Sequence, residues 1–403
     1  MADFGGEDLE GFRVEAQTWL EDNFPKALAE DPAAQVAAMG GGRESEEARL
    51  WRERMGAKGW GVPTWPAPYG GGGLSRPQAR ILAEEMARIG ARNPIGGMGV
   101  MMFGPTLLEY GTEALKHQHM PGIVTGSVRW CQGYSEPGSG SDLASLQTRC
   151  EDKGDHWLIN GQKIWTSGAN IADWCFCLVR TDTSKKHEGI SFVLIDMRTP
   201  GVEVRPIKLI NGTSPFCETF FTDVKVPKDQ LFGPLNGGWT VAKRLLQFER
   251  DNIAADLGDG SIGAPVSALT VREAALDYVG LDEDGRLANP DLRRRIVDHL
   301  METQAFQLTV RRAADESKSN QGPSAVTSIM KYAGAKIAQE RNELIVESLG
   351  TAGLGWEGEG FSAPELAAVR TWLRAKANSI EGGTSEINLN VVSKRVLGLP
   401  DPR

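Results

Sequence analysis

The sequence predicts an α+β protein in which a helical region, a β region and a second helical region follow one another along 403 residues. Apolar residues recur at three-to-four spacing near the start, short β-branched and aromatic segments follow, and the helical spacing then returns. A chain of this length is too long to fold around a single hydrophobic core, so we expect several domains. We set them at residues 1–125, 126–235 and 236–403.

The first domain is predicted to be α-helical. Apolar residues follow the helical period in Glu7–Asn23, Glu44–Lys58 and Gln78–Ile89, which is typical of amphipathic helices. The stretch GWGVPTWPAPYGGGGLS (59–75) interrupts this pattern, because proline cannot continue a helix and glycine permits positive φ. We therefore expect a loop there.

The second domain is predicted to be a β domain. The segments WLING, WCFCLVRTD, GISFVLIDM, GVEVRPIKLI and CETFFTDVKVP are short, rich in β-branched or aromatic residues and separated by turn-forming residues. Strands do not alternate with helices here, so a parallel dinucleotide-binding sheet is not expected. A flavin would have to bind without a Rossmann fold.

The third domain is predicted to be a helical bundle. The helical period returns after Trp239 in TVAKRLLQFERDNIAADL and continues in Asp291–Asp315, Ser324–Leu349 and Ala363–Ala377. Pattern alone leaves an enzyme, a binding module and an assembly subunit open.

Composition excludes several classes of function. The net charge of -9 and the pI near 5.3 argue against binding to nucleic acid, which requires basic residues. The start of the chain lacks the pattern of a secretory signal, and no apolar run approaches the roughly 20 residues of a membrane span. Histidines at metal-binding spacing are absent from the sequence, so no metal site is expected. The cysteines form no CxxC pair, which favours reduced thiols and a cytoplasmic protein; they are Cys131, Cys150, Cys175, Cys177 and Cys217.

Five motifs carry a family resemblance. WCQGYSEPGSGSDLASLQTRC followed by WLINGQKIWTSGANIADWCFCLVRTD resembles the flavin-binding signature of acyl-CoA dehydrogenases. GWGVPTWPAPYGGGGLS, FTDVKVPKDQLFGPLNGGW and EGGTSEINLNVVSKRVLGLP stand in the family's order and spacing, so the resemblance covers essentially the full chain. It implies an N-terminal helical domain, a central antiparallel β domain and a C-terminal four-helix bundle, assembled as a homotetramer or heterotetramer that binds FAD.

The resemblance also implies two groups of cofactor-binding residues. Those matching positions along the isoalloxazine ring are Tyr134, Ser135, Gly140, Ser141, Trp165, Thr166 and Ser167. Those matching positions near the pyrophosphate and the adenine end are Gly350, Thr351, Thr384 and Glu386. Purely structural roles stay open: a turn between strands, a core tryptophan, and an N-cap at Thr384.

The catalytic base has two candidates. The commonest family arrangement has a glutamate where this chain has Gly382, with Glu381 one residue too early. Other family branches take the base from the helix that opens the C-terminal domain, where Glu249 stands among apolar residues in LLQFERDNIAADL. Apolar surroundings strengthen a carboxylate as a base, so Glu249 is the predicted base and Glu381 the alternative. Arg250 matches an arginine near the thioester, and Ser141 is also predicted to contact substrate.

One family motif is incomplete. The R-x-x-F-G segment that supplies an arginine to the FAD pyrophosphate appears only as LDEDGRLANPDLRRR, and the choice between Arg286 and Arg293 stays open.

The activity implied by the resemblance is oxidation of an acyl-CoA to the 2-enoyl-CoA, with an electron-transfer flavoprotein as electron acceptor. The motifs resemble bacterial members acting on bulky degradative substrates, including steroid side chains. The alternatives are a non-catalytic partner subunit of a heteromeric dehydrogenase and an oxygen-using oxidase or monooxygenase on the same scaffold.

Overall fold

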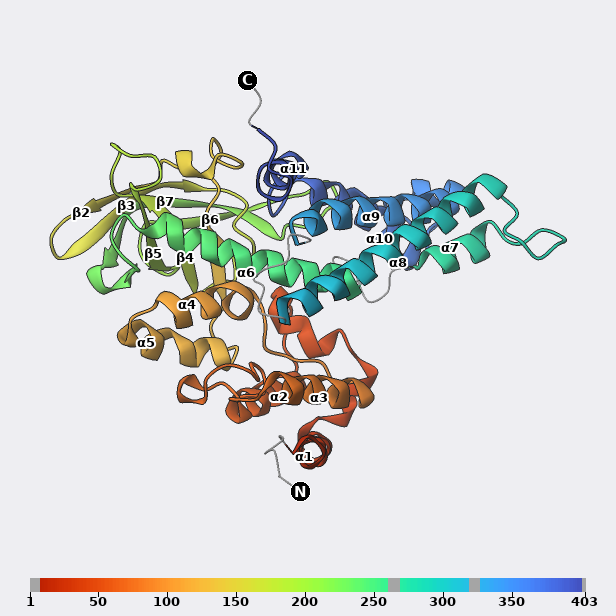
Figure 1. The fold of residues 1–403 in the computed structure, drawn as a ribbon, viewed down its shortest axis with the longest axis horizontal. Coiled ribbons are helices and arrows are strands. Elements are labelled where there is room, and N and C mark those ends of the chain that lie inside the picture. Colours follow the sequence, from red (N-terminus) through yellow and green to blue (C-terminus); the bar gives the residue numbers. More distant parts are fainter. Residues whose placement is uncertain (1–7, 260–268, 319–326, 401–403) are drawn as a thin grey trace. The chain divides into compact units, whose positions relative to one another are not determined.

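Figure 1 shows the computed structural model, which describes residues 8–259, 269–318 and 327–400. Within these ranges the side chains of residues 38–40, 249–259, 314–315, 317–318 and 327–328 fall outside the description. The chain divides into two compact units. The first comprises Met1–Ile207 with Pro215–Leu246, and the second comprises Lys208–Ser214 with Gln247–Arg403.

The N-terminal part of the first unit is helical, as predicted. Its α-helices are α1 (Leu9–Asn23), α2 (Glu46–Lys58), α3 (Arg76–Arg88), α4 (Gly104–Tyr110) and α5 (Glu113–Val124). A capping box begins α3, because the Ser75 hydroxyl accepts from the Gln78 amide and the Gln78 side chain accepts from the Ser75 amide. The predicted loop between α2 and α3 is confirmed and holds one short 3-10 turn, Ala67–Tyr69.

An eight-stranded sheet forms most of the rest of the first unit, which also includes the beginning of α6 (Gly238–Asp259) (Figure 1). Its strands are β1 (Trp130–Gly133), β2 (Arg149–Asp152), β3 (His156–Lys163), β4 (Trp174–Arg180), β5 (Ile190–Asp196), β6 (Val202–Ile207), β7 (Phe216–Pro227) and β8 (Leu231–Phe232). The strand order is β6-β7-β3-β2-β4-β5-β8, with β1 paired to β4. Most pairs are antiparallel, in line with the predicted fold class, but β1 runs parallel to β4 and β2 meets β4 at one parallel pair.

The central strands are buried on both faces, which explains their continuous apolar sequence. Along β4, Phe176 and Leu178 join the core that includes the N-terminal helices, whereas Cys175 and Cys177 join a second core on the other face. All five cysteines are buried free thiols, and burial raises the pKa of Cys150 to about 12. A raised pKa disfavours the thiolate, which is the reactive form of a cysteine.

The second unit is helical, as predicted. Its helices are the C-terminal part of α6 (Gly238–Asp259), α7 (Val271–Tyr278), α8 (Pro290–Lys318), α9 (Thr327–Ser348), α10 (Ala363–Ala375) and α11 (Ser385–Val391). Helices α7, α8, α10 and α11 all pack against α9. In the described ranges, no helix combines the length and the apolar character that crossing a membrane requires.

Candidate functional site

Two strand ends bring predicted cofactor-binding segments together in the first unit. Strand β1 ends at Gly133 and leads into Tyr134 and Ser135, while β3 ends at Lys163 and leads into Ile164–Ser167. The Ile164 amide donates a hydrogen bond of 2.8 Å to the Ser135 carbonyl. The two segments therefore lie side by side although about 30 residues separate them.

Trp165 is presented to solvent in a strained conformation. Its φ is 62°, in the left-handed region that a bulky residue rarely adopts, and the residue is 52% exposed. Its neighbour Thr166 exchanges backbone hydrogen bonds of 3.0 and 3.2 Å with Cys217, which fixes this conformation. Strain held in place by surrounding bonds is a common feature of ligand-binding segments.

The hydroxyl groups beside Trp165 differ in their availability. The Thr166 hydroxyl is fully buried and bonds to the Cys217 carbonyl at 2.9 Å and to the Thr219 hydroxyl at 2.8 Å. In the part of the chain that the structure describes, the hydroxyls of Ser135 and Ser167 have no hydrogen-bond partner. The ring edge of a flavin carries hydrogen-bonding atoms and its faces are flat, so two uncommitted hydroxyls beside an exposed indole fit this group.

Gly140 and Ser141 lie in an exposed loop that follows a tight turn. Glu136 and Ser139 exchange backbone hydrogen bonds across that turn, at 3.2 and 2.9 Å. A Cβ atom at Gly140 would meet no atom within 4 Å, so packing within the chain does not require glycine there. Open space at this position is compatible with a ligand approaching the backbone.

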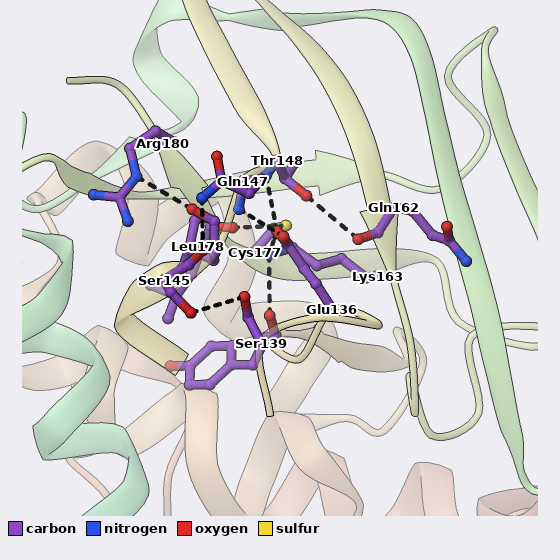
Figure 2. A network of polar contacts seen from close by, with 12 residues as sticks. Glu136, Ser139, Ser145, Gln147, Thr148, Gln162, Lys163, Cys177, Leu178 and Arg180 are labelled. Carbon is purple, nitrogen blue, oxygen red and sulfur yellow. Dashed lines mark hydrogen bonds and ion pairs between the residues drawn. The ribbon is translucent and has the colours of Figure 1, made fainter. Parts of the chain in front are cut away.

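A buried ion pair joins these segments, and sequence reasoning missed it (Figure 2). Lys163 is fully buried, and its Nζ lies 2.8 Å from Glu136 Oε1 and 3.0 Å from the Tyr134 carbonyl oxygen. The other contacts of the Glu136 carboxylate are the amides of Gln147 and Thr148, at 2.6 and 2.8 Å. Burial by itself would raise the pKa of Glu136, but the charge of Lys163 and the hydrogen bonds to the carboxylate leave the pKa below its usual value.

Strand periodicity carried a signal for this pair. Alternate residues of β3 face inward, and Trp157, Ile159 and Lys163 occupy that face. A lysine at an inward position of a half-buried strand requires a buried partner.

Arg180 ties the neighbouring loop to the end of β4 (Figure 2). Its guanidinium is buried and donates to four backbone carbonyls, with distances from 2.6 to 3.2 Å; these carbonyls belong to Ala144, Leu146, Lys185 and Lys186. Burial lowers the pKa of Arg180, while the charge of Glu136 opposes this effect. Arg180 thus holds the end of the loop that contains Gly140 and Ser141.

A cavity of about 530 Å³ opens beside this network. Its lining residues are Glu136, Pro137, Gly138, Ser139, Ser145, Gln147, Thr148, Gly161 and Gln162. Since the lining includes none of the residues predicted to bind the cofactor, we do not assign this cavity to FAD.

The predicted pyrophosphate and adenine residues lie in the second unit. Gly350 follows α9 with a φ of 56°, a conformation that favours glycine, and Thr351 beside it is exposed. Thr384 is the N-cap of α11, because its hydroxyl accepts from the Ile387 amide at 3.2 Å, as the structural reading of this residue predicted. Glu386 is exposed in the first turn of the same helix.

The candidate bases differ in what the structure describes. Glu249 and Arg250 belong to α6, but their side chains lie outside the described residues. Glu381 forms an ion pair of 2.6 Å with Arg374 and precedes two positive-φ glycines.

The two arginines considered for the pyrophosphate are in different surroundings. Arg286 is exposed, 3.8 Å from Asp284, and Arg293 is partly exposed near the start of α8. Within the described ranges, no group of three His, Cys, Asp or Glu side chains is placed to hold a metal ion.

Comparison with known proteins places this architecture in a class. The helical, β-sheet and helical regions match three family models: the acyl-CoA dehydrogenase N-terminal domain over residues 11–127, the middle domain over 131–224 and the C-terminal domain over 236–397. The fold and these three matches therefore define an enzyme of the three-domain acyl-CoA dehydrogenase type.

Similar full-length proteins narrow the class to a family. The acyl-CoA dehydrogenase IpdE1 of Mycobacterium tuberculosis is 36% identical over 98% of both chains. Among solved structures, a steroid ACAD variant, Tcur3481-Tcur3483 G363A, is 30% identical with a TM-score of 0.74 and covers 98% of this chain and 99% of that chain. The ChsE4-ChsE5 complex from Mycobacterium tuberculosis is 28% identical with a TM-score of 0.72 over the full length of both chains. The chain belongs to the acyl-CoA dehydrogenase family, whose members bind FAD.

Proposed function

We propose that this protein is an FAD-dependent dehydrogenase that converts an acyl-CoA thioester to the 2-enoyl-CoA. The observation that carries the proposal is the strand-end site, where Trp165 is exposed in a left-handed conformation and the segments of Ser135 and Ser167, whose hydroxyls have no partner among the described residues, are joined by the Ile164–Ser135 hydrogen bond. When bound, FAD supplies the acceptor for the hydride that leaves the β carbon.

The role of the site residues is then to bind the cofactor and to orient it. The hydroxyls of Ser135 and Ser167 would donate hydrogen bonds to a flavin ring, and the exposed Trp165 indole would pack on it. Thr166 anchors this segment to β7 through its buried hydroxyl. The residues that approach the distal part of the cofactor are Gly350, Thr351, Thr384 and Glu386, while Ser141 and Arg250 contact the substrate.

Glu249 is the proposed base for the α proton. This proton is weakly acidic, so its removal requires a carboxylate held close to it and shielded from water. The alternative base, Glu381, is bound to Arg374 at 2.6 Å, and its use would first require breaking this ion pair.

A bulky acyl group is the proposed substrate class, and an electron-transfer flavoprotein is the proposed acceptor. Support for the substrate comes from the similarity to solved structures titled steroid ACAD, at 28 and 30% identity.

Assembly with further chains is proposed as well. Exposed apolar side chains occur along α8, a feature of surfaces that other chains cover; they are Val297, Leu300, Met301 and Leu308. Similarity to the ChsE4-ChsE5 complex favours a second candidate function, that of one subunit in a heteromeric dehydrogenase.

The test is the rate of flavin reduction in single turnover. Wild type, Glu249→Gln and Glu381→Gln are mixed anaerobically with a bulky acyl-CoA, and Glu273→Gln serves as a control because Glu273 only caps α7. We expect a loss of at least about 100-fold in Glu249→Gln alone, the size that general-base catalysis contributes. A loss confined to Glu381→Gln would move the base, and turnover that appears only after a second chain is added would favour the subunit function.

A further inference from the structure

We infer that Lys163 and Glu136 form a positioning pair that holds the two cofactor-binding segments in register with each other. The inference rests on the proposed function, because it assigns the pair to the same cofactor site. Neither residue is assigned to contact the cofactor. Both act through the backbone: Tyr134 and Glu136 flank Ser135, and Lys163 precedes Trp165 by two residues.

The pair stands where the two segments meet. Glu136 directly follows Ser135, and Lys163 is two residues before Trp165. Lys163 Nζ donates to the Tyr134 carbonyl at 3.0 Å and to Glu136 Oε1 at 2.8 Å. One ammonium group therefore bonds to the first segment, residues 134–136, at two positions. The Ile164 amide adds a third bond, to the Ser135 carbonyl at 2.8 Å.

The carboxylate extends the same control to a third segment. The Glu136 carboxylate accepts the amides of Gln147 and Thr148, which follow the loop containing Gly140 and Ser141. Arg180 holds the same end of that loop through the carbonyls of Ala144 and Leu146. The first segment and the end of the loop that follows it are therefore bonded directly to one ion pair, and the second segment is joined to them through Lys163 and the hydrogen bond from the Ile164 amide to the Ser135 carbonyl.

Stability alone does not account for this arrangement. Burying two charges is costly, and replacing a buried ion pair with uncharged side chains of similar volume is often neutral or stabilising. Apolar side chains would fill the space but would not direct the Tyr134 carbonyl or the amides at 147 and 148. The particular contribution of the charged pair is geometric.

A double-mutant cycle separates the two contributions. Lys163→Met leaves a buried carboxylate without its counter-charge, and Glu136→Gln leaves a buried ammonium. Lys163→Met with Glu136→Gln removes both charges and keeps one side-chain oxygen acceptor, which serves only one of the two amides because these bond to different oxygens of Glu136. The matched control is Glu85→Gln. Glu85 is also a buried carboxylate of the first unit, paired with Arg13 at 2.6 Å and Arg88 at 2.7 Å, but it lies among the N-terminal helices.

Three quantities are measured on each purified full-length variant: the thermal unfolding midpoint, the dissociation constant of added FAD, and hydrogen exchange of the peptides containing residues 147–148 and 164–166. We expect the double variant to recover most of the midpoint lost in Lys163→Met. Its dissociation constant for FAD should nevertheless stay raised by about 10-fold or more, because misplaced contacts weaken binding. Both peptides should exchange faster than in wild type. Glu85→Gln should show the reverse: a lower midpoint with wild-type FAD affinity and wild-type exchange in these peptides.

Each outcome decides between the alternatives. If FAD affinity in the double variant returns together with the midpoint, the pair is only a stabilising feature and the inference is overturned. Wild-type exchange of the two peptides in the double variant would overturn it as well. If the wild-type protein binds no FAD, the proposed function fails, and the exchange data still decide whether the pair orders these segments.

Discussion

Trp165 lies edge-on against Phe216, with ring centroids 6.0 Å apart and an interplanar angle of 89°. Despite this contact, Trp165 remains 52% exposed. The backbone strain at Trp165 and the exposure of its side chain both lower the stability of the folded chain. We interpret them as features of a binding site in which a ligand ring packs on the indole.

Trp165→Gly tests this interpretation. Glycine accepts a φ of 62° without strain, so relief of strain offsets the loss of packing and the free energy of unfolding should change by only about 1 kcal/mol. FAD affinity should fall by about 10-fold, because stacking on an aromatic ring contributes roughly 1 kcal/mol or more. Urea denaturation and FAD fluorescence titration measure the two quantities, and unchanged FAD affinity would remove Trp165 from the site.

Thr166 and Ser167 should respond in opposite ways. Thr166→Val removes the buried hydroxyl that bonds to Cys217 and Thr219, and we expect a loss of about 1–3 kcal/mol of stability. Ser167→Ala removes a hydroxyl without a partner among the described residues, so stability should hardly change while FAD affinity falls. Equal effects of both substitutions on FAD affinity and stability would contradict this division of roles.

Arg180→Met should destabilise the protein by about 2–4 kcal/mol, because it strips buried carbonyl groups of their donors. Lys186→Met is the control, in the loop that follows β4. It removes only a solvent-exposed ion pair with Asp142 and should leave the unfolding midpoint close to that of wild type. An unfolding midpoint of Arg180→Met close to that of wild type would contradict this prediction and would show that water can hydrogen-bond these carbonyl groups in place of the guanidinium.

His119 should make stability depend on pH. It packs edge-on against both Trp130 and Trp174, and its Nε2 lies 3.0 Å from Gln230 Oε1. Burial lowers the pKa of His119 below its ordinary value, although the contact with Gln230 and the charge of Asp229 oppose this effect. In the window between the lowered folded pKa and the ordinary unfolded pKa near 6.5, the unfolded chain binds more protons, so stability falls as pH falls through that window.

The comparison is made by urea unfolding of wild type and His119→Gln at pH 7.5 and pH 5.5. We expect wild type to lose more stability than the variant between these two values. Burial also lowers the pKa of His299, so wild type and variant share a background loss and only their difference reports on His119. Equal losses would contradict the assignment.

The sequence predicted the fold because each region has its own spacing of apolar residues, helical or strand-like. This spacing can be recognised from residues that are close together along the chain. Trp157 and Ile159 mark the inward face of β3 from the sequence alone. The parallel pairing of β1 with β4 could not be predicted, since it depends on which distant segment lies opposite. The contact of Lys163 with Glu136 has the same origin: each charge is visible in the sequence, but their separation of 27 residues conceals the pairing.

Trp165 and Thr166 show a second limit. Strand alternation would continue past Lys163, but the left-handed residue at Trp165 breaks it and turns Thr166 inward. Family resemblance indicated the correct segment without indicating which of its side chains is already committed to the fold. The difference between the anchoring hydroxyl of Thr166 and the uncommitted hydroxyl of Ser167 arises only in the folded chain.

Flavin-dependent dehydrogenation of an acyl-CoA thioester is the proposed activity of this chain. The most direct measurement is the visible absorbance of the purified, FAD-loaded protein during anaerobic addition of a panel of acyl-CoA thioesters from short straight chains to bulky steroid side chains. We predict that the flavin absorbance bleaches with at least one bulky thioester and that the 2-enoyl-CoA appears in equal amount. A protein that binds no FAD, or a bound flavin that no thioester bleaches, would contradict the claim.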